Sequence, residues 1–298
     1  MSTSTAIRPP VRSALSALID YAGLFPPAQL AIAEASSEYQ AARRGPHAWM
    51  LGRFIIPAPM LVASSHELEG PFSVIADGER ETLNAIAALA GNQIGVEALE
   101  IPLPADDSPA DIVDAIGELR AAIVDTDLGD RPVFVELPRS DRWSKLLPGA
   151  MEALGRDNLG AKLRCGGGTA EAFPSVREVA DFIAAAVAAR VPFKATAGLH
   201  HPVRHLDPTS GFMMHGFLNL LAGSALAPRV DFDTLARIVA EEDADAFGFD
   251  DASFVWRKER IGVPELAQTR RETFVAYGSC SFTEPVSDLL SLGLLPAP

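Results

Sequence analysis

The segment that decides the fold reads Leu159-Gly-Ala-Lys-Leu-Arg-Cys-Gly-Gly-Gly168 and continues through a helical stretch into Val191-Pro-Phe-Lys-Ala-Thr-Ala-Gly198. Each of the two apolar pieces ends in a lysine that is followed four residues later by a glycine. A right-handed crossover between two parallel strands needs a connection of about this length. The segment therefore predicts a βαβ unit that places Lys162 and Lys194 on neighbouring strands, where the two side chains can meet.

Other short apolar segments repeat this alternation of strand and helix. Besides the two strands that carry the lysines, strands are expected at residues 14–20, 48–56, 72–76, 96–101, 133–137 and 246–249. Helical spacing separates them, for example from Ile112 to Ile123, behind a capping sequence that begins at Ser108. Eight strands alternating with helices predict a (β/α)8 TIM barrel. An open doubly wound sheet is the alternative, but no glycine-rich nucleotide turn follows the first expected strand.

We expect a single domain over residues 1–298, because 48% hydrophobic residues can form one large core and α/β barrels commonly have this length. An apolar insertion at about residues 203–230 separates the seventh and eighth expected strands. Barrel geometry places such an insertion at the active-site mouth, as a lid or as an oligomer contact. The C-terminal tail, residues 279–298, is expected to form a short helix packed over the barrel. Assembly into a homo-oligomer stays open.

The composition excludes several classes of partner. A net charge of −14 and the absence of a basic block argue against binding to nucleic acid or to an anionic membrane. Two cysteines are too few for a disulfide framework and fit a reducing compartment. The segment from Met1 to Arg12 lacks the apolar centre of a signal peptide, and no run of residues is long enough to span a bilayer. The sequence thus predicts a cytoplasmic protein.

Charged residues stand at the carboxyl ends of the expected strands, where a barrel places its catalytic groups. They are Asp20, Glu100, Glu136, Lys162, Arg164 and Lys194. Lys162 and Arg164 share one face of a strand, and Lys194 comes from the adjoining strand. Three neighbouring cations, together with burial, are expected to lower the lysine pKa from ~10.4 toward neutrality. A neutral amine attacks a carbonyl to form a Schiff base, and a nearby carboxylate then moves the protons for carbon–carbon cleavage.

Two other roles stay open for these residues and for the histidines. The charges can form a structural ring of salt bridges, in which Glu100 and Glu136 neutralise the lysines. His200 and His201, with His205 and His215 further on, can bind a divalent metal. Adjacent histidines on an extended segment point to opposite sides, so at most one of the first two faces a given site. A substrate hydrogen bond or a solvated loop is therefore preferred for them, and no metal site is expected.

The order of these features resembles the deoxyribose-phosphate aldolase branch of the Schiff-base, or class I, aldolases. The matching segments span about residues 13–199 and comprise Leu18-Ile-Asp20, Arg53-Phe-Ile55, Glu100, Val135-Glu136, Lys162-Leu-Arg-Cys-Gly166 and Lys194-Ala-Thr-Ala-Gly198. The resemblance implies that Lys162 forms the Schiff base and that Lys194 lowers the pKa of Lys162. It also implies that Glu100 and Asp20 move protons between the reacting groups.

The chain departs from that family's pattern at several positions. Residues 163–165 are not the small hydroxyl residues that follow the first lysine, and Glu100 is one methylene longer than the family's aspartate. Residues 199–201 read Leu-His-His in place of Ile-Arg. After the expected eighth strand, Asp250 and Asp251 stand where serines and backbone amides would hold a phosphate. Because carboxylates repel a phosphate dianion, we expect a non-phosphorylated substrate.

These features together predict a Schiff-base aldolase or related carbon–carbon lyase that acts, without metal or cofactor, on a small carbonyl compound. Its expected catalytic residues are Lys162, Lys194, Glu100 and Asp20. The expected substrate contacts are Arg164, Glu136, Arg53, His200, His201 and Asp250. One alternative is a metal-dependent barrel isomerase or hydrolase that uses a histidine with Glu100 and Glu136. Another is a catalytically silent barrel used for binding, which full ion pairing of both lysines would favour.

Overall fold

The computed structural model describes residues 7–104, 108–128 and 131–296, and within them eight parallel strands close into a barrel. The barrel strands are β1 (Ile19–Tyr21), β2 (Leu51–Pro57), β3 (Phe72–Ile75), β4 (Val96–Pro102), β5 (Val133–Glu136), β6 (Gly160–Arg164), β7 (Phe193–Thr196) and β13 (Phe274–Ser279). Around the ring their order is β1, β13, β7, β6, β5, β4, β3 and β2. The predicted (β/α)8 barrel is therefore confirmed.

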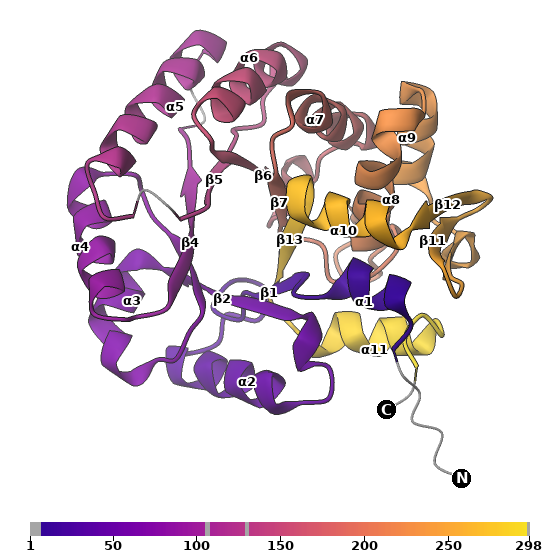
Figure 1. The fold of residues 1–298 in the computed structure, drawn as a ribbon, viewed down its shortest axis with the longest axis horizontal. Coiled ribbons are helices and arrows are strands. Elements are labelled where there is room, and N and C mark those ends of the chain that lie inside the picture. Colours follow the sequence, from indigo (N-terminus) through magenta and orange to yellow (C-terminus); the bar gives the residue numbers. More distant parts are fainter. Residues whose placement is uncertain (1–6, 105–107, 129–130, 297–298) are drawn as a thin grey trace.

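Helices surround the barrel as an outer layer (Figure 1). Their bounds are α1 (Pro9–Leu15), α2 (Ile32–Arg44), α3 (Ala58–Ser64), α4 (Arg80–Gly91), α5 (Pro109–Val124), α6 (Trp143–Arg156), α7 (Val176–Ala189), α8 (Phe217–Leu226), α9 (Phe232–Ala240), α10 (Val263–Glu272) and α11 (Thr283–Ser291). Capping boxes begin two of them. The side chains of Ser108 and Ser175 each accept the amide hydrogen of the third helical residue, whose carboxylate accepts in return. The cap expected at Ser108 is thus confirmed.

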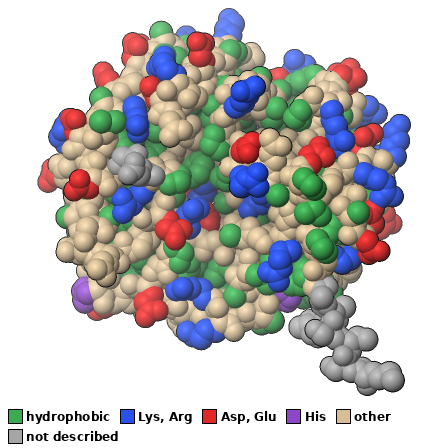
Figure 2. Space-filling model, in the orientation of Figure 1, with side chains coloured by type: hydrophobic (Ala, Val, Ile, Leu, Met, Phe, Trp, Pro, Cys, Tyr) green, Lys and Arg blue, Asp and Glu red, His purple; other side chains and the backbone are tan. Residues whose placement is uncertain are grey.

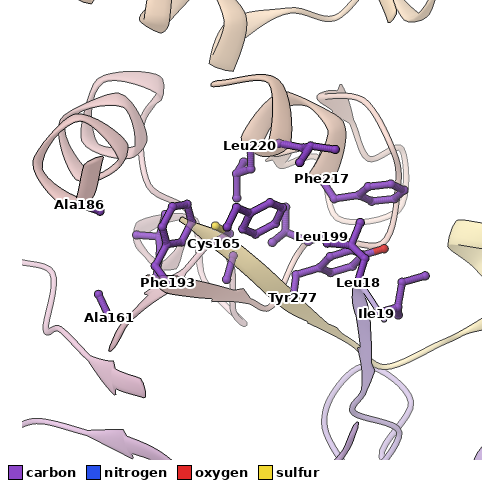
Figure 3. Close-up of a cluster of buried hydrophobic side chains, with 14 of the residues drawn as sticks. Leu18, Ile19, Ala161, Cys165, Ala186, Phe193, Leu199, Phe217, Leu220 and Tyr277 are labelled. Carbon is purple, nitrogen blue, oxygen red and sulfur yellow. The ribbon is translucent and has the colours of Figure 1, made fainter. Parts of the chain in front are cut away.

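Apolar side chains between the strands and the helices form the core. Phe193 of β7 packs edge-on against Phe182 of α7, and its ring centroid lies 5.3 Å from that of Phe274 on β13. Figure 3 shows that the same cluster also includes Phe217 and Leu220 of α8. Most charged side chains instead lie on the surface, where acidic and basic groups are interspersed (Figure 2). The few buried charges therefore call for a separate explanation.

The first expected strand, residues 14–20, is wrong over most of its length. Residues 9–15 form α1, and Ala17 adopts a left-handed φ of 46°, so the chain turns before β1 begins at Ile19. A short apolar run fits a buried helix as well as a buried strand. Pro9 and Pro10 suit the first turn of a helix, where no intrahelical hydrogen bond is lost, and they were the missed signal.

The expected eighth strand at residues 246–249 is also wrong. Residues 247–249 form β10, which pairs antiparallel with β11 (Ser253–Trp256), and β11 pairs with β12 (Glu259–Gly262) in a separate sheet. The barrel is closed instead by β13, which pairs with β7 on one side and β1 on the other. Both segments are short and apolar, so hydrophobic periodicity does not distinguish them.

The apolar insertion between β7 and β13 contributes a buried helix, α8, to the layer outside the barrel strands. After the hairpin of β8 (His205–Leu206) and β9 (Met213–Met214), every residue of α8 is buried. The helix packs against α7, α9, α10 and β13. Phe217 stacks on Tyr277 of β13, with 4.9 Å between the ring centroids. Helix α8 therefore belongs to the outer layer of helices around the barrel.

The chain ends confirm one expectation and leave others outside the structure. The expected C-terminal helix is confirmed, since α11 begins four residues after β13 ends. The sequence predicted that the first twelve residues are not a signal peptide, and residues 1–6 of that segment lie outside the described residues. The last two residues of the tail lie outside them as well. Among the helices that the structure describes, none combines the length and the apolarity needed to cross a bilayer.

Candidate active site

Four charged side chains of the barrel strands are buried: Asp20, Glu100, Lys162 and Lys194. Lys162 of β6 and Lys194 of β7 pair in register, as the βαβ unit predicted. Lys194 contacts residues of β1, β3 and β4, which are not its neighbours in the ring. These contacts must therefore cross the interior of the barrel, and the four charges form one cluster there.

Glu100 of β4 contacts both lysines. Its Oε2 lies 2.8 Å from Nζ of Lys162, and its Oε1 lies 2.5 Å from Nζ of Lys194. Glu136 of β5 also contacts Lys162, with 2.9 Å between Oε2 and Nζ, and its Oε1 accepts a hydrogen bond of 2.7 Å from Nε of Arg164. Cations and carboxylates thus alternate from Arg164 through Glu136, Lys162 and Glu100 to Lys194.

The innermost part of this series surrounds Lys194. Its Nζ lies 2.5 Å from Oδ2 of Asp20 and donates a hydrogen bond of 3.1 Å to Oγ of Ser73. Ser73 donates in turn to Oε1 of Glu100 at 2.6 Å. Oδ1 of Asp20 accepts the backbone N–H of Arg53 at 2.6 Å. The sequence did not single out Ser73, whose one signal is a small polar side chain within an otherwise apolar strand.

The exposure of these side chains shows which lysine lies nearer to solvent. The exposed fraction is 0% for Asp20 and Glu100 and 1% for Lys194, and it rises to 4% for Lys162, 12% for Glu136 and 53% for Arg164. Arg164 is the last residue of β6, and the carboxyl ends of barrel strands face the mouth. Of the two lysines, Lys162 is therefore the one nearer to the exposed end of the cluster.

The carboxylates change the expected charge state of Lys162. Burial lowers the pKa of its ammonium group, but the charges of Glu100 and Glu136 raise that pKa by more, so it lies above the ordinary value of 10.5. Burial likewise raises the pKa of Glu100, yet the two lysines hold it well below its ordinary 4.5. The expectation of a lowered lysine pKa is thus wrong for Lys162. It counted the neighbouring cations and omitted the carboxylates that separate them.

The side chain of Arg53 lies apart from the mouth. Its Nε forms an ion pair of 3.3 Å with Oε2 of Glu97, the second residue of β4. This position is near the amino end of the strand, whereas the mouth lies at the carboxyl ends. Arg53 therefore positions Asp20 through its backbone, and the structure does not place its side chain where the expected substrate contact would occur.

His200 and His201 follow β7 at the mouth end and are held by α11. Nδ1 of His200 lies 2.9 Å from Oε2 of Glu284, and Nδ1 of His201 lies 2.5 Å from Oδ2 of Asp288, one helical turn further on. Sγ of Cys280 is almost equally far from both ring nitrogens of His200, at 3.7 and 3.6 Å. Neither histidine pairs with Glu100 or Glu136. Their described contacts fasten the loop after β7 to the C-terminal helix.

Asp250 lies outside the barrel, and the expectation that it contacts substrate is wrong. It occupies the turn between β10 and β11, where its Oδ1 accepts the backbone N–H groups of Ala252 and Ser253. Its Oδ2 forms an ion pair with Arg260 of β12. Because β10 is not a barrel strand, the turn that follows it is not one of the loops at the carboxyl ends of the barrel strands. The expected repulsion of phosphate by Asp250 and Asp251 loses its basis.

Comparison with known proteins identifies a distant structural likeness. No family model matches the chain, and no curated protein sequence matches it. Among solved structures the chain is similar to a deoxyribose phosphate aldolase from Aeropyrum pernix whose tetrameric structure is described as unique. The two share 11% sequence identity, with a TM-score of 0.47 over 94% of this chain and 93% of that chain. At this identity the likeness concerns the fold alone, which the closed strand order of this chain establishes by itself.

The described residues offer few groups that can hold a metal ion. Across residues 7–104, 108–128 and 131–296, no three histidine, cysteine, aspartate or glutamate side chains are arranged to bind one. Each carboxylate of the barrel cluster instead contacts a lysine. The cluster thus brings two lysine ammonium groups into contact with three carboxylates.

Proposed function

We propose that this protein is a Schiff-base-forming lyase, an aldolase-like enzyme in which Lys162 attacks the carbonyl carbon of a small substrate. The observation that carries the proposal is the place of Lys162, nearest the mouth of the two lysines and in contact with two carboxylates. Schiff-base chemistry needs an amine that the substrate can reach and groups that exchange protons with it. Lys162 contacts two such carboxylates, and of the two lysines it lies nearer to the mouth.

The resting ion pairs define the first step of the reaction. The ammonium group of Lys162 transfers a proton to Glu136, whose Oε2 is 2.9 Å away, and the neutral amine attacks the carbonyl to give a carbinolamine. Glu136 returns the proton to the hydroxyl group, water leaves, and an iminium ion remains. The iminium then accepts the electron pair of the carbon–carbon bond that breaks. At the same time a carboxylate removes the proton from the hydroxyl group of the departing fragment, which leaves as an aldehyde or ketone. Hydrolysis of the resulting enamine restores the lysine.

The cost of burying these charges supports a catalytic role. Replacing buried ion pairs with apolar residues of similar volume is often neutral or stabilises a protein by about 1–4 kcal/mol. A barrel interior is ordinarily filled by branched apolar side chains. Two lysines, two carboxylates and Ser73 instead occupy this one. Stability alone therefore gives little reason to retain them, whereas catalysis does.

One observation favours a second candidate, a catalytically silent barrel. Both lysines are fully ion-paired: Lys162 with Glu100 and Glu136, and Lys194 with Glu100 and Asp20. In a silent barrel these pairs would persist and Lys162 would not react with carbonyl compounds. The two candidates therefore differ in one measurable property, the reactivity of Lys162.

The carboxylate at the start of α11 supports a non-phosphorylated substrate. Barrels that bind phosphate commonly do so with the loops after strands seven and eight and with the amino end of a short helix there. In this chain α11 follows the eighth strand, and its first turn carries Glu284 beside His200. A phosphate group at that place would meet a negative charge.

Reductive trapping tests the proposed function. The purified protein is incubated with borohydride and a panel of small aldehydes and ketones, and the adduct is located by intact mass and peptide mapping. We expect one adduct per chain, on Lys162. An adduct on Lys194 alone would reverse the roles of the two lysines, and unmodified protein with every carbonyl compound would support the silent barrel.

The raised pKa of Lys162 predicts how trapping depends on pH. At pH 7 an ordinary lysine with a pKa of ~10.4 is neutral in fewer than about one molecule in two thousand, and a raised pKa makes that fraction smaller. The rate of adduct formation should therefore rise steadily from pH 7 to pH 10. We would measure initial trapping rates with cyanoborohydride at fixed ionic strength. A rate that reaches a plateau near pH 7 would show that the reactive amine is already neutral there.

A further inference from the structure

We propose that the substrate carries a carboxylate within a few bonds of its carbonyl carbon, as in a 2-oxo or 3-oxo acid, and that Arg164 binds this group. The inference rests on the proposed function, since it names the substrate class of the same site. It is carried by the position of Arg164, the hydrogen bonds that its guanidinium lacks, and the contact with Glu136 that it shares with Lys162.

Arg164 is placed to meet a substrate bound to Lys162. The two residues lie two positions apart on β6 and therefore share a face of the strand, with Arg164 one step nearer to the mouth. The Arg164 side chain is 53% exposed, and its Nε donates to Oε1 of Glu136. Within the described part of the chain, no acceptor contacts its two terminal nitrogens. A planar pair of free donors matches the two oxygens of a carboxylate.

The shared contact with Glu136 limits how far the anionic group can be from the carbonyl carbon. One oxygen of Glu136 is 2.9 Å from Nζ of Lys162, and the other is 2.7 Å from Nε of Arg164. Adding the ~2.2 Å between the two oxygens of a carboxylate puts Nε of Arg164 at most about 8 Å from Nζ of Lys162, and the terminal nitrogens that carry the free donors lie at most ~2.3 Å further on. A new C–N bond of ~1.3 Å and a hydrogen bond of ~2.8 Å use part of this span of about 10 Å. The remainder, at most about 6 Å, fits a carboxylate within a few bonds of the carbonyl carbon, including one attached directly to it or one carbon removed.

The proposed proton transfer also frees Arg164 when the substrate binds. Glu136 is the nearest anion to Arg164 in the resting site and is also the proposed proton acceptor for Lys162. Once protonated, Glu136 no longer carries the charge that holds Arg164. The carboxylate of the substrate replaces it, so the number of charges around Arg164 stays the same. Binding of the substrate carboxylate and deprotonation of Lys162 thereby favour each other.

The test compares pyruvate with methyl pyruvate, which keeps the ketone and removes the charge. With the unmodified protein we expect trapping of pyruvate to saturate at a concentration about 10- to 100-fold lower than that of methyl pyruvate, the range that a hydrogen bond to a charged group provides. Arg164→Gln should abolish this preference by weakening the binding of pyruvate and leaving that of methyl pyruvate unchanged. Arg164→Lys should keep part of the preference. Arg177→Gln, an exposed arginine of α7, is the matched control and should leave both substrates unchanged.

Two further measurements separate this inference from the proposed function. Lactate cannot form a Schiff base, so Arg164-dependent binding of lactate, measured by calorimetry, would support the carboxylate site even if no carbonyl compound gives an adduct. Dihydroxyacetone phosphate tests the other common anion, and tighter binding of it than of pyruvate would overturn the carboxylate assignment. Equal trapping of pyruvate and methyl pyruvate on Lys162, unaffected by Arg164→Gln, would also overturn it while leaving the Schiff-base lyase intact.

Discussion

Replacing Lys162 by methionine is expected to abolish reductive trapping and to lower the rate of carbon–carbon cleavage by more than about a thousandfold. Methionine keeps the length and apolar stem of lysine but removes the amine that attacks the carbonyl. The adduct would be counted by intact mass after borohydride treatment, with pyruvate as the carbonyl compound. Trapping that continues at the same rate and maps to another lysine would contradict the assignment.

Lys194→Met is the matched control for that experiment, because it removes the other buried amine of the same cluster. Lys194 neutralises Asp20 and Glu100. Its loss leaves more negative charge around Lys162 and should raise the pKa of Lys162 further. The variant should still form its adduct on Lys162, more slowly at pH 7 and with partial recovery at alkaline pH. A pH profile of unchanged shape would show that Lys194 does not influence the reactive amine. Both variants would be checked for folding by circular dichroism.

Glu100→Gln is expected to cause the largest loss of stability among substitutions in the cluster. Glu100 is fully buried and contacts both lysines, so the substitution leaves two buried ammonium groups without their shared anion. Breaking a buried ion pair from one side costs about 3–5 kcal/mol of unfolding free energy. Urea titration at pH 7 would measure the change. Glu97→Gln removes an exposed carboxylate from the same strand, paired with Arg53, and should cost less than about 1 kcal/mol.

The acid side of the stability profile gives an independent test of the same residue. Because the pKa of Glu100 is lowered in the folded protein, its contribution is complete above the ordinary value of 4.5 and is lost as the pH falls below that value toward the folded pKa. The unmodified protein should therefore lose stability below pH 4.5 more steeply than Glu100→Gln. Parallel profiles for the two proteins would show that Glu100 does not carry the lowered pKa.

Hydrophobic periodicity and the paired lysine motifs predicted the fold class and most of the barrel strands. They failed at the two ends of the barrel, where the first strand was extended over α1 and the last was placed at residues 246–249. A short apolar segment has the same pattern in a helix, in a barrel strand and in a small antiparallel sheet. Only pairing with β7 and β1 identifies β13 as the strand that closes the ring.

The sequence predicted which residues belong to the candidate site better than it predicted where their side chains lie. Strand-end positions identified Asp20, Glu100, Glu136 and both lysines, and the structure brings all five together. Ser73 was missed because one small polar residue on a buried strand carries no chemical pattern of its own. Asp250 and the side chain of Arg53 were included because position in a linear sequence does not show which end of the barrel, or which sheet, a residue joins.

The sequence by itself determined that Lys162 and Lys194 lie side by side, because two parallel strands joined by one helical crossover place their equivalent residues in register. What the tertiary structure alone decided is the charge state of Lys162. Its pKa depends on Glu100 and Glu136, which come from β4 and β5 and approach its Nζ only when the ring of strands closes. Coulomb interactions depend on distance in space and not on separation along the chain, so a lysine expected to be nearly neutral is held as an ammonium ion.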